Sequence, residues 1–130
     1  MDIPSSKPPL KNGTTKQSGD AAEDEALRYL KRQGLHLLQR NYRSPGRGGG
    51  EIDLIMATPD GTTVFVEVRS RASGSHGGAA ASISFFKQQR IVFAARHYLL
   101  RQRRVPPCRF DVVLVEPAGL QWLQAAFDAG

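Results

Sequence analysis

The stretch GEIDLIMATPDGTTVFVEVRS, residues 50–70, contains two apolar runs separated by a turn. Its central TPDG has proline at the second position and glycine at the fourth, which is typical of a β-turn. The flanking runs, EIDLIMA and TTVFVEVRSR, are rich in β-branched residues and predict the two strands of a hairpin. Asp53 and Glu67 interrupt these runs, so a carboxylate stands in each of two segments that otherwise favour burial.

Strand geometry is expected to bring these two carboxylates together at one edge of the hairpin. Side chains alternate along a strand, so Asp53 should share a face with Ile55 and lie opposite to Ile52, while Glu67 should share a face with Arg69. Buried like charges repel and lose hydration, so they need compensation. Two interpretations remain open. One is a divalent cation such as Mg²⁺, and the other is an ion-pair network with Arg69, Arg71 or an arginine of a later helix.

The pattern around the hairpin is that of an α/β domain. Residues 20–33 have helical apolar spacing, an acidic first turn and Gly34 as a C-cap. A second helix is marked by an apolar stripe made of Ile83, Phe86, Ile91, Ala94, Ala95, Tyr98 and Leu99. The remaining predicted elements are a strand at 35–43, glycine-rich loops at 44–50 and 72–82, a strand at 109–115, and a strand or short helix at 120–127. The order of helix, three strands, helix and two strands predicts a mixed sheet covered by helices.

The composition of the first 18 residues differs from that of the rest. Residues 1–18 are rich in Pro, Gly, Ser, Thr and Lys and predict a disordered tail, which leaves 19–130 as a single domain. The lone Cys108 cannot form an internal disulfide. No apolar run reaches the roughly 18 residues of a membrane helix, and the N-terminus has no signal-peptide core. We therefore expect a cytoplasmic protein that does not engage a membrane.

Basic residues exceed acidic ones, 18 to 12, and two long stretches, 26–50 and 83–110, contain no acidic residue. This pattern favours a polyanionic partner such as nucleic acid, and scattered solubilising arginines are the alternative. The candidate nucleic-acid contacts are Arg47, Lys87, Gln88, Arg90, Arg101, Arg103 and Arg104.

The acidic hairpin resembles a known nuclease motif. GEIDLI, the fourteen-residue step from Asp53 to Glu67, and VEVR resemble the Asp…Glu-x-Lys core of the restriction-endonuclease-like, or PD-(D/E)XK, nuclease superfamily. With EDEALRYLKRQGLHLLQRNYR upstream and KQQRIVFAARHYL and RFDVVLV downstream, the chain is identified as a member of the YraN family, which is similar to archaeal Holliday-junction resolvases. The resemblance extends over about residues 20–127.

The resemblance implies a restriction-endonuclease-like three-layer α/β fold, with a mixed sheet flanked by helices. It also implies that Asp53 and Glu67 ligate Mg²⁺ or Mn²⁺, with the backbone carbonyl of Val68 as a further ligand. Glu23 matches the first-helix acid of the superfamily, although a charge near a helix N-terminus explains it equally well. Superfamily helices often direct a Lys or Gln at the site, as Lys87 and Gln88 would do here, and ordinary solvated helix residues are the alternative.

Arg69 departs from the superfamily pattern, because it stands where lysine is usual. Arginine can stabilise charge on a phosphorane but cannot act as a base. Two functions therefore compete. One is a metal-dependent endonuclease acting on branched or structured DNA, with Glu23, Asp53, Glu67 and Arg69 as catalytic residues, and the other is a non-catalytic nucleic-acid-binding protein. A homodimer is suggested only by analogy with resolvases, which cut two strands.

Overall fold

The computed structural model describes residues 13–71 and 83–129. The elements are α1 (Gly13–Arg32), β1 (His36–Arg43), β2 (Glu51–Ala57), β3 (Thr63–Ser70), α3 (Phe85–Leu99), β4 (Cys108–Glu116) and β5 (Gly119–Phe127). This order confirms the predicted one, and the segment for which strand and helix competed is a strand. In the described part of the chain, no helix is long and apolar enough to cross a membrane.

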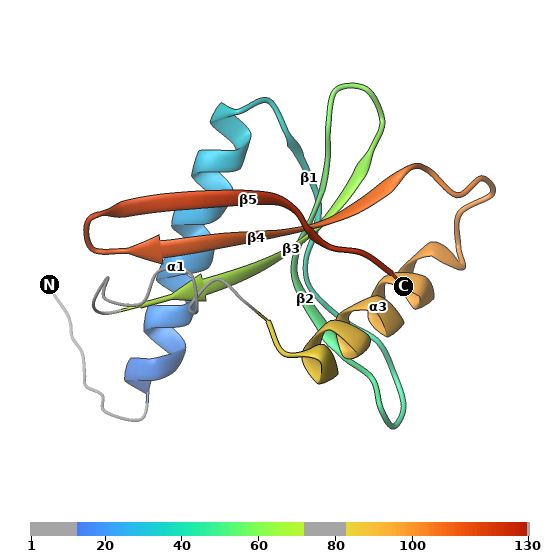
Figure 1. The fold of residues 1–130 in the computed structure, drawn as a ribbon, viewed down its shortest axis with the longest axis horizontal. Coiled ribbons are helices and arrows are strands. Elements are labelled where there is room, and N and C mark those ends of the chain that lie inside the picture. The colour runs from blue at the N-terminus through green and yellow to red at the C-terminus, as the bar shows by residue number, and fades with distance from the viewer. Residues whose placement is uncertain (1–12, 72–82, 130) are drawn as a thin grey trace, which may run out of the picture.

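The five strands form one mixed sheet in the order β1-β2-β3-β4-β5. β3 and β4 run parallel, and the other neighbouring pairs are antiparallel. Figure 1 shows α1 and α3 lying along the sheet, with α3 in the connection between the parallel strands. A parallel connection needs such a crossover, because two parallel strands cannot be joined by a tight turn.

Two hydrophobic clusters fill the spaces between the sheet and its helices. Val64 and Val66 of β3 belong to the cluster under α1, whereas Phe65 belongs to the cluster under α3. Consecutive side chains of a strand point to opposite faces, so α1 and α3 cover opposite faces of the sheet. The fold is therefore a three-layer α/β domain with β3 at its centre, as predicted.

Helix α1 begins at Gly13, seven residues before the predicted start at residue 20. Residues 13–18 are thus helical, although they were expected to belong to a disordered tail, and residues 1–12 lie outside the described range. The predicted acidic first turn is also wrong, because the acidic residues lie in the middle of this 20-residue helix and none is in its first turn. The C-terminal prediction is confirmed, since Gly34 follows the helix with a φ of 98°.

Helix α3 begins at Phe85, where the Ser84 side chain caps it by accepting a hydrogen bond from the Lys87 N–H at 3.1 Å. Ile91, Val92, Ala94 and Ala95 are its buried residues. Ile83, predicted as helical, is buried just before the helix. Phe86 was predicted to lie on the buried stripe, but its side chain is 70% exposed and points away from the core.

The predicted alternation of β2 is wrong at one position. Ile52 lies in the cluster under α3 together with Ile55, whereas Leu54 lies in the cluster under α1. Strict alternation would have put Ile52 and Leu54 on one face. The neighbouring strand is irregular at the same place, because Asn41, between the residues paired with Leu54 and Ile52, has a φ of 54°. Asp53 lies where the strand changes face.

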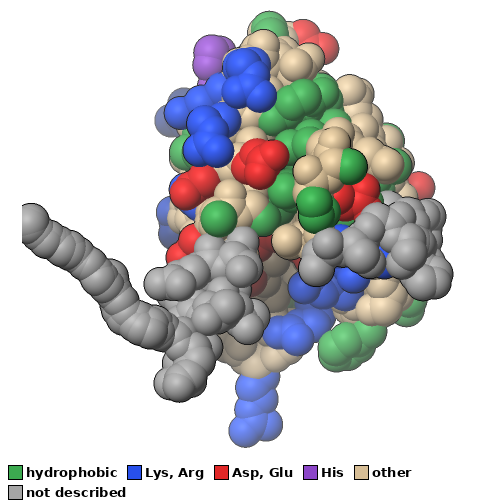
Figure 2. Space-filling view, turned by 90° about the vertical axis from the view of Figure 1, so that its left-hand side faces the viewer, with side chains coloured by type: hydrophobic (Ala, Val, Ile, Leu, Met, Phe, Trp, Pro, Cys, Tyr) green, Lys and Arg blue, Asp and Glu red, His purple; other side chains and the backbone are tan. Residues whose placement is uncertain are grey.

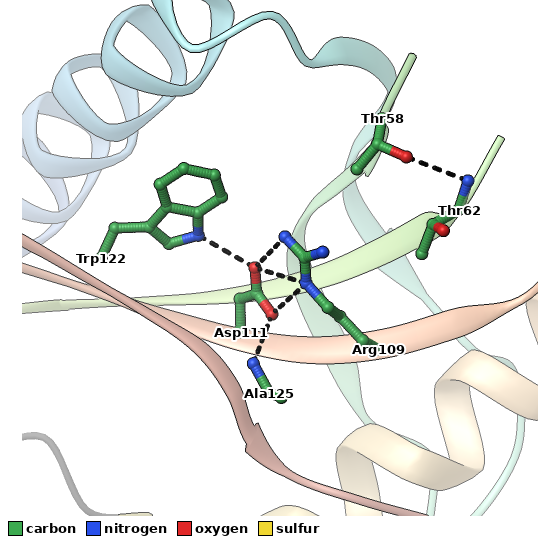
Figure 3. A network of polar contacts seen from close by, with 6 residues as sticks. All are labelled: Thr58, Thr62, Arg109, Asp111, Trp122 and Ala125. Carbon is green, nitrogen blue, oxygen red and sulfur yellow. Dashed lines mark hydrogen bonds and ion pairs between the residues drawn. The ribbon is translucent and has the colours of Figure 1, made fainter. Parts of the chain in front are cut away.

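Asp111 of β4 is a fully buried carboxylate with a complete set of donors (Figure 3). Its Oδ1 accepts from Arg109 Nε at 3.0 Å and from the Ala125 N–H at 2.9 Å, and its Oδ2 accepts from Trp122 Nε1 at 2.9 Å. Ala125 has a φ of 51°, and the β4–β5 register shifts between Phe110 and Val112. The Asp111 carboxylate therefore fixes the irregular edge strand β5 against β4.

The turn that joins β2 to β3 is closed by a separate hydrogen bond, which the backbone N–H of Thr62 donates to Thr58 Oγ1 (Figure 3).

Asp111→Ala should lower the free energy of unfolding by about 3–5 kcal/mol, because it leaves the guanidinium of Arg109 and the buried indole N–H without their acceptor. Urea unfolding followed by tryptophan fluorescence measures this difference. Glu25→Ala, on an exposed position of α1, is the control and should change the free energy by less than about 0.5 kcal/mol. A similar small change in both variants would show that the Asp111 network does not stabilise the fold.

Candidate functional site

Asp53 marks the point where β2 and β3 stop pairing. Their ladder runs from Ala57 and Thr63 to Leu54 and Val66. One residue beyond it, Asp53 Oδ2 accepts a hydrogen bond from the backbone N–H of Val68 at 2.8 Å. A side chain thus satisfies a backbone donor at the end of the ladder, which holds the Asp53 carboxylate beside β3.

Glu67 lies in β3, where its side chain is only 9% exposed. Lys87 Nζ, from the first turn of α3, lies 3.2 Å from Glu67 Oε2. The ion-pair interpretation of the carboxylates is therefore met for Glu67, although by a lysine of the later helix rather than by an arginine. The prediction that Lys87 faces the carboxylates is confirmed by this contact.

Glu23 approaches from α1, on the other layer of the fold. Burial raises the pKa of Glu23, and the charge of Asp53 raises it further, while Arg40 of β1, with its Nε 3.4 Å from Glu23 Oε1, acts in the opposite direction. Because α1 begins at Gly13, Glu23 lies in mid-helix and the helix-terminus explanation for it is wrong. The structure thus places the first-helix acid beside Asp53.

Asp53 is the most perturbed carboxylate of this group. Burial, followed by the charge of Glu67, raises the pKa of Asp53 to about 7, with a smaller contribution from Glu51. The Val68 N–H and Lys87 lower it without cancelling these effects. The carboxylates therefore repel one another, and Asp53 keeps its proton until the pH is close to neutral.

The ion pairs show which carboxylate of the site lacks a cationic partner. Glu23 pairs with Arg40, and Glu67 pairs with Lys87. Glu51 pairs with Arg43 at 3.2 Å. Asp53 has no ion pair within the described residues, although it lies beside carboxylates of two other elements.

The donor set suits a hard divalent cation. Carboxylate and carbonyl oxygens are the ligands that Mg²⁺ takes, and it commonly binds through one or two carboxylates, with waters and substrate phosphates completing its shell. Across residues 13–71 and 83–129, no three His, Cys, Asp or Glu side chains are grouped as a complete metal site. A metal at Asp53 and Glu67 would therefore depend on water and substrate for its remaining ligands.

The raised pKa of Asp53 gives a testable pH dependence. Between pH 4 and 7 the folded protein keeps a proton on Asp53 that the unfolded chain has released, so the metal-free protein should lose stability as the pH rises through this window. Asp53→Asn should remove this loss of stability, because an amide does not ionise. In EDTA at pH 8 the variant should be more stable than the wild type by up to about 4 kcal/mol, and near pH 4 the two should be equal.

Thermal unfolding across this pH range measures the effect. Asp60→Asn is the matched control, because hydrogen bonds with Thr58 and Thr62 lower the pKa of exposed Asp60, so its amide should not stabilise the protein at pH 8. If Asp53→Asn were instead less stable than the wild type at pH 8, the carboxylate would be a structural anchor.

Arg69, the predicted catalytic cation, follows Glu67 by two residues on β3 and is half-buried. The two side chains share a face of the strand, the face that carries Phe65 and α3. Arg69 and Lys87 therefore both bring positive charge to the side of the sheet on which Glu67 lies.

The predicted nucleic-acid contacts are spread along α3 and the segments on either side of it. Arg90 Nε and Nη2 donate to the carbonyl of Gly49 at 3.1 and 2.7 Å, which ties α3 to the loop containing Arg47. Gln88 donates to the Ile83 carbonyl at 2.8 Å. Near the carboxylates the structure thus places Lys87 and, along the same helix, Arg90. Arg101, Arg103 and Arg104 lie beyond the C-terminal end of α3, roughly 20 Å from Lys87 at 1.5 Å per helical residue.

Charges that are separate along the chain meet in space. Arg40, Arg43 and Arg109 belong to the acid-free stretches, yet each forms an ion pair. Figure 2 shows Asp and Glu side chains interspersed with Lys and Arg side chains on one face of the molecule. The acid-free stretches therefore supply fewer unpaired cations than their length indicates.

The glycine-rich loop before β2 packs closely against α3. A Cβ on Gly50 would lie 2.3 Å from the Arg90 carbonyl oxygen, so α3 packs directly on this glycine. Buried Ser44 closes the loop, because its Oγ accepts from the Gly50 N–H at 3.0 Å. The four glycines of this loop thus include one, Gly50, whose lack of a side chain allows α3 to approach.

Comparison with known proteins assigns the chain to one family, the one that its sequence motifs resemble. Residues 22–115 match the model of the uncharacterised protein family UPF0102. A UPF0102 protein of Albidiferax ferrireducens is 70% identical over 129 residues, covering 99% of both chains. A UPF0102 protein of Paracidovorax citrulli is 68% identical over 117 residues, covering 90% of this chain and 87% of the relative. The matched region contains Glu23, Asp53, Glu67 and Lys87, and the chain belongs to the UPF0102, or YraN, family.

Proposed function

We propose that this chain is a cytoplasmic, metal-dependent endonuclease of the restriction-endonuclease-like superfamily that acts on branched or structured DNA. The observation that carries the proposal is the meeting of Asp53 and Glu67 at the end of the β2–β3 ladder, with Glu23 beside them and one of the carboxylates lacking an ion pair among the described residues. Two neighbouring carboxylates that can hold Mg²⁺ or Mn²⁺, with cations near them to contact the phosphate, are the groups that metal-dependent phosphodiester hydrolysis uses.

Each residue has a distinct role in this proposal. Asp53 and Glu67 would hold the metal, with the Val68 carbonyl as a further ligand, and the metal would polarise the scissile phosphodiester. Arg69 would contact a non-bridging phosphate oxygen and stabilise the charge that develops there. Lys87 is paired with Glu67 in the free protein and would turn to the phosphate when the metal takes over that carboxylate. Glu23 would restrain the Asp53 carboxylate from the opposite layer.

A cleavage assay across linear, flapped, forked and four-way DNA, with Mg²⁺, Mn²⁺ or EDTA, tests the proposal. We expect cleavage of branched substrates with either metal and none in EDTA. The Asp53→Asn variant, purified in the same way, is the control for a contaminating nuclease, because a contaminant would cleave in both preparations. Absence of metal-dependent cleavage on every structure, with metal binding also absent by calorimetry, would refute the proposal.

A second function is favoured by one residue. Arg69 replaces the lysine of the superfamily motif, and arginine does not release a proton to serve as a base. A non-catalytic nucleic-acid-binding protein with the nuclease fold is therefore the alternative. It predicts DNA binding that persists without metal and no cleavage under any condition.

A further inference from the structure

The outer face of α3 exposes aromatic side chains. Phe86 is 70% exposed and Phe93 is 46% exposed. Burying either ring would be favourable by a few kcal/mol, so such exposure on one helix face marks a surface that contacts a ligand. Phe86 and Phe93 are seven residues apart and thus lie on the same side of the helix, two turns from each other.

These rings line a groove of about 510 Å³. Its other lining residues include the polar or basic Gln89, Arg90 and Arg96, together with Gly48 and Val92. The Arg90 guanidinium carbon lies 5.8 Å from the centre of the Phe86 ring. The groove therefore alternates aromatic rings with cations, the combination that suits nucleobases joined by phosphates.

The groove adjoins Lys87, which contacts one of the carboxylates. Arg90 also lines two smaller hollows, one with Glu51 and Lys87 and one with Arg43 and Glu51. Lys87 contacts Glu67 at 3.2 Å, and Phe86 is the residue before Lys87. A strand whose phosphate lies at the carboxylates would thus have its neighbouring nucleotides at the Phe86 end of the groove.

Arg90 is held in place before any ligand arrives. Two of its nitrogens donate to the Gly49 carbonyl, and its own backbone is packed against Gly50. A cation that is already fixed loses little side-chain entropy when it meets a phosphate. The groove therefore has a preorganised basic centre between Phe86 and Phe93.

We infer that this groove binds unpaired bases of a nucleic-acid strand by stacking them on Phe86 and Phe93, with Arg90 and Arg96 contacting the intervening phosphates. This inference rests on the proposed function and specifies its substrate, which must contain a single-stranded segment beside the scissile phosphate. Paired bases are stacked within a duplex and cannot offer their faces to these rings. Self-association through the same face is disfavoured, because a two-fold contact would bring the arginines of two copies together.

Binding of a fluorescent 20-nucleotide oligothymidine, its duplex with oligoadenosine and an abasic strand of the same length tests the inference by anisotropy in EDTA. We expect Phe86→Ala and Phe93→Ala to weaken binding to oligothymidine by about tenfold each. Binding to the duplex and to the abasic strand should not change. Phe85→Ala is the matched control, because Phe85 is 73% exposed but does not line the groove. Thermal unfolding verifies that all three variants remain folded.

An equal loss of affinity for all three ligands, or no loss of affinity for any of them, would overturn the inference. A change from dimer to monomer in sedimentation, with oligothymidine binding unaltered, would assign the groove to a second copy of this chain instead. The outcomes also separate this inference from the proposed function. Base-dependent binding without metal-dependent cleavage would refute only the nuclease proposal, whereas cleavage that is unaffected by loss of both rings would refute only the base-binding groove.

Discussion

Asp53→Asn should lower Mg²⁺-dependent cleavage of branched DNA by on the order of 10³-fold or more, which is the largest effect we expect from a single substitution. The amide keeps the shape of the side chain and can still accept the hydrogen bond from Val68, but it is a poor ligand for a hard cation. Glu67→Gln should have the same consequence. Single-turnover cleavage with excess protein measures the chemical step without interference from product release.

Binding to the same DNA in Ca²⁺ or EDTA provides the control for this prediction. Both variants should bind as tightly as the wild type or slightly more tightly, because less negative charge then faces the phosphates. Loss of folding in step with loss of cleavage would instead favour the structural interpretation, in which the carboxylates serve only ion pairs. The Glu67–Lys87 contact makes that interpretation concrete for Glu67, whereas Asp53 has no such pair in the described residues.

The elements were predictable because each depends on local pattern. The hairpin of residues 51–70 follows from β-branched runs around a proline-glycine turn, and the structure has β2 and β3 in those positions. The early part of α1 was missed because Gly13, Thr14, Thr15 and Gly19 have low helix propensity.

The composition of the site was predictable only in part. The cross-strand approach of Asp53 and Glu67 follows from a hairpin with a known turn, so sequence spacing is sufficient. The contact between Lys87 and Glu67 depends on how α3 crosses the sheet, which no local pattern specifies. The same is true of Phe86, since an apolar residue at helical spacing resembles a core residue until the direction of the helix face is known.

The proposed nuclease therefore has two cations where the superfamily motif has one lysine. Arg69 brings a fixed guanidinium from β3, and Lys87 brings a mobile ammonium from the first turn of α3. A guanidinium offers several donors in a rigid plane, whereas an ammonium is a compact charge on a flexible stem. The two cations would therefore approach the phosphate from different elements of the fold.

Arg69→Ala should lower the rate of the cleavage step by on the order of 10²-fold, because it removes one contact to charge that develops in the transition state. DNA binding should change little, since a single phosphate contact among several is lost. Lys87→Ala is the comparison, and the double variant shows whether the two cations act on the same step. Additive losses would mean independent roles, and a double variant no worse than either single one would mean a shared role.

Arg69→Lys separates the two functions most sharply, because it restores the superfamily lysine while keeping the charge. We expect this variant to cleave at least as well as the wild type in the single-turnover assay. An inert wild type with a cleaving Arg69→Lys variant would identify a binding protein that retains a nuclease site. If both are inert while calorimetry detects Mg²⁺ binding that Asp53→Asn abolishes, the assayed DNA lacks the required structure. If neither binds metal, the carboxylates of β2 and β3 serve the fold alone.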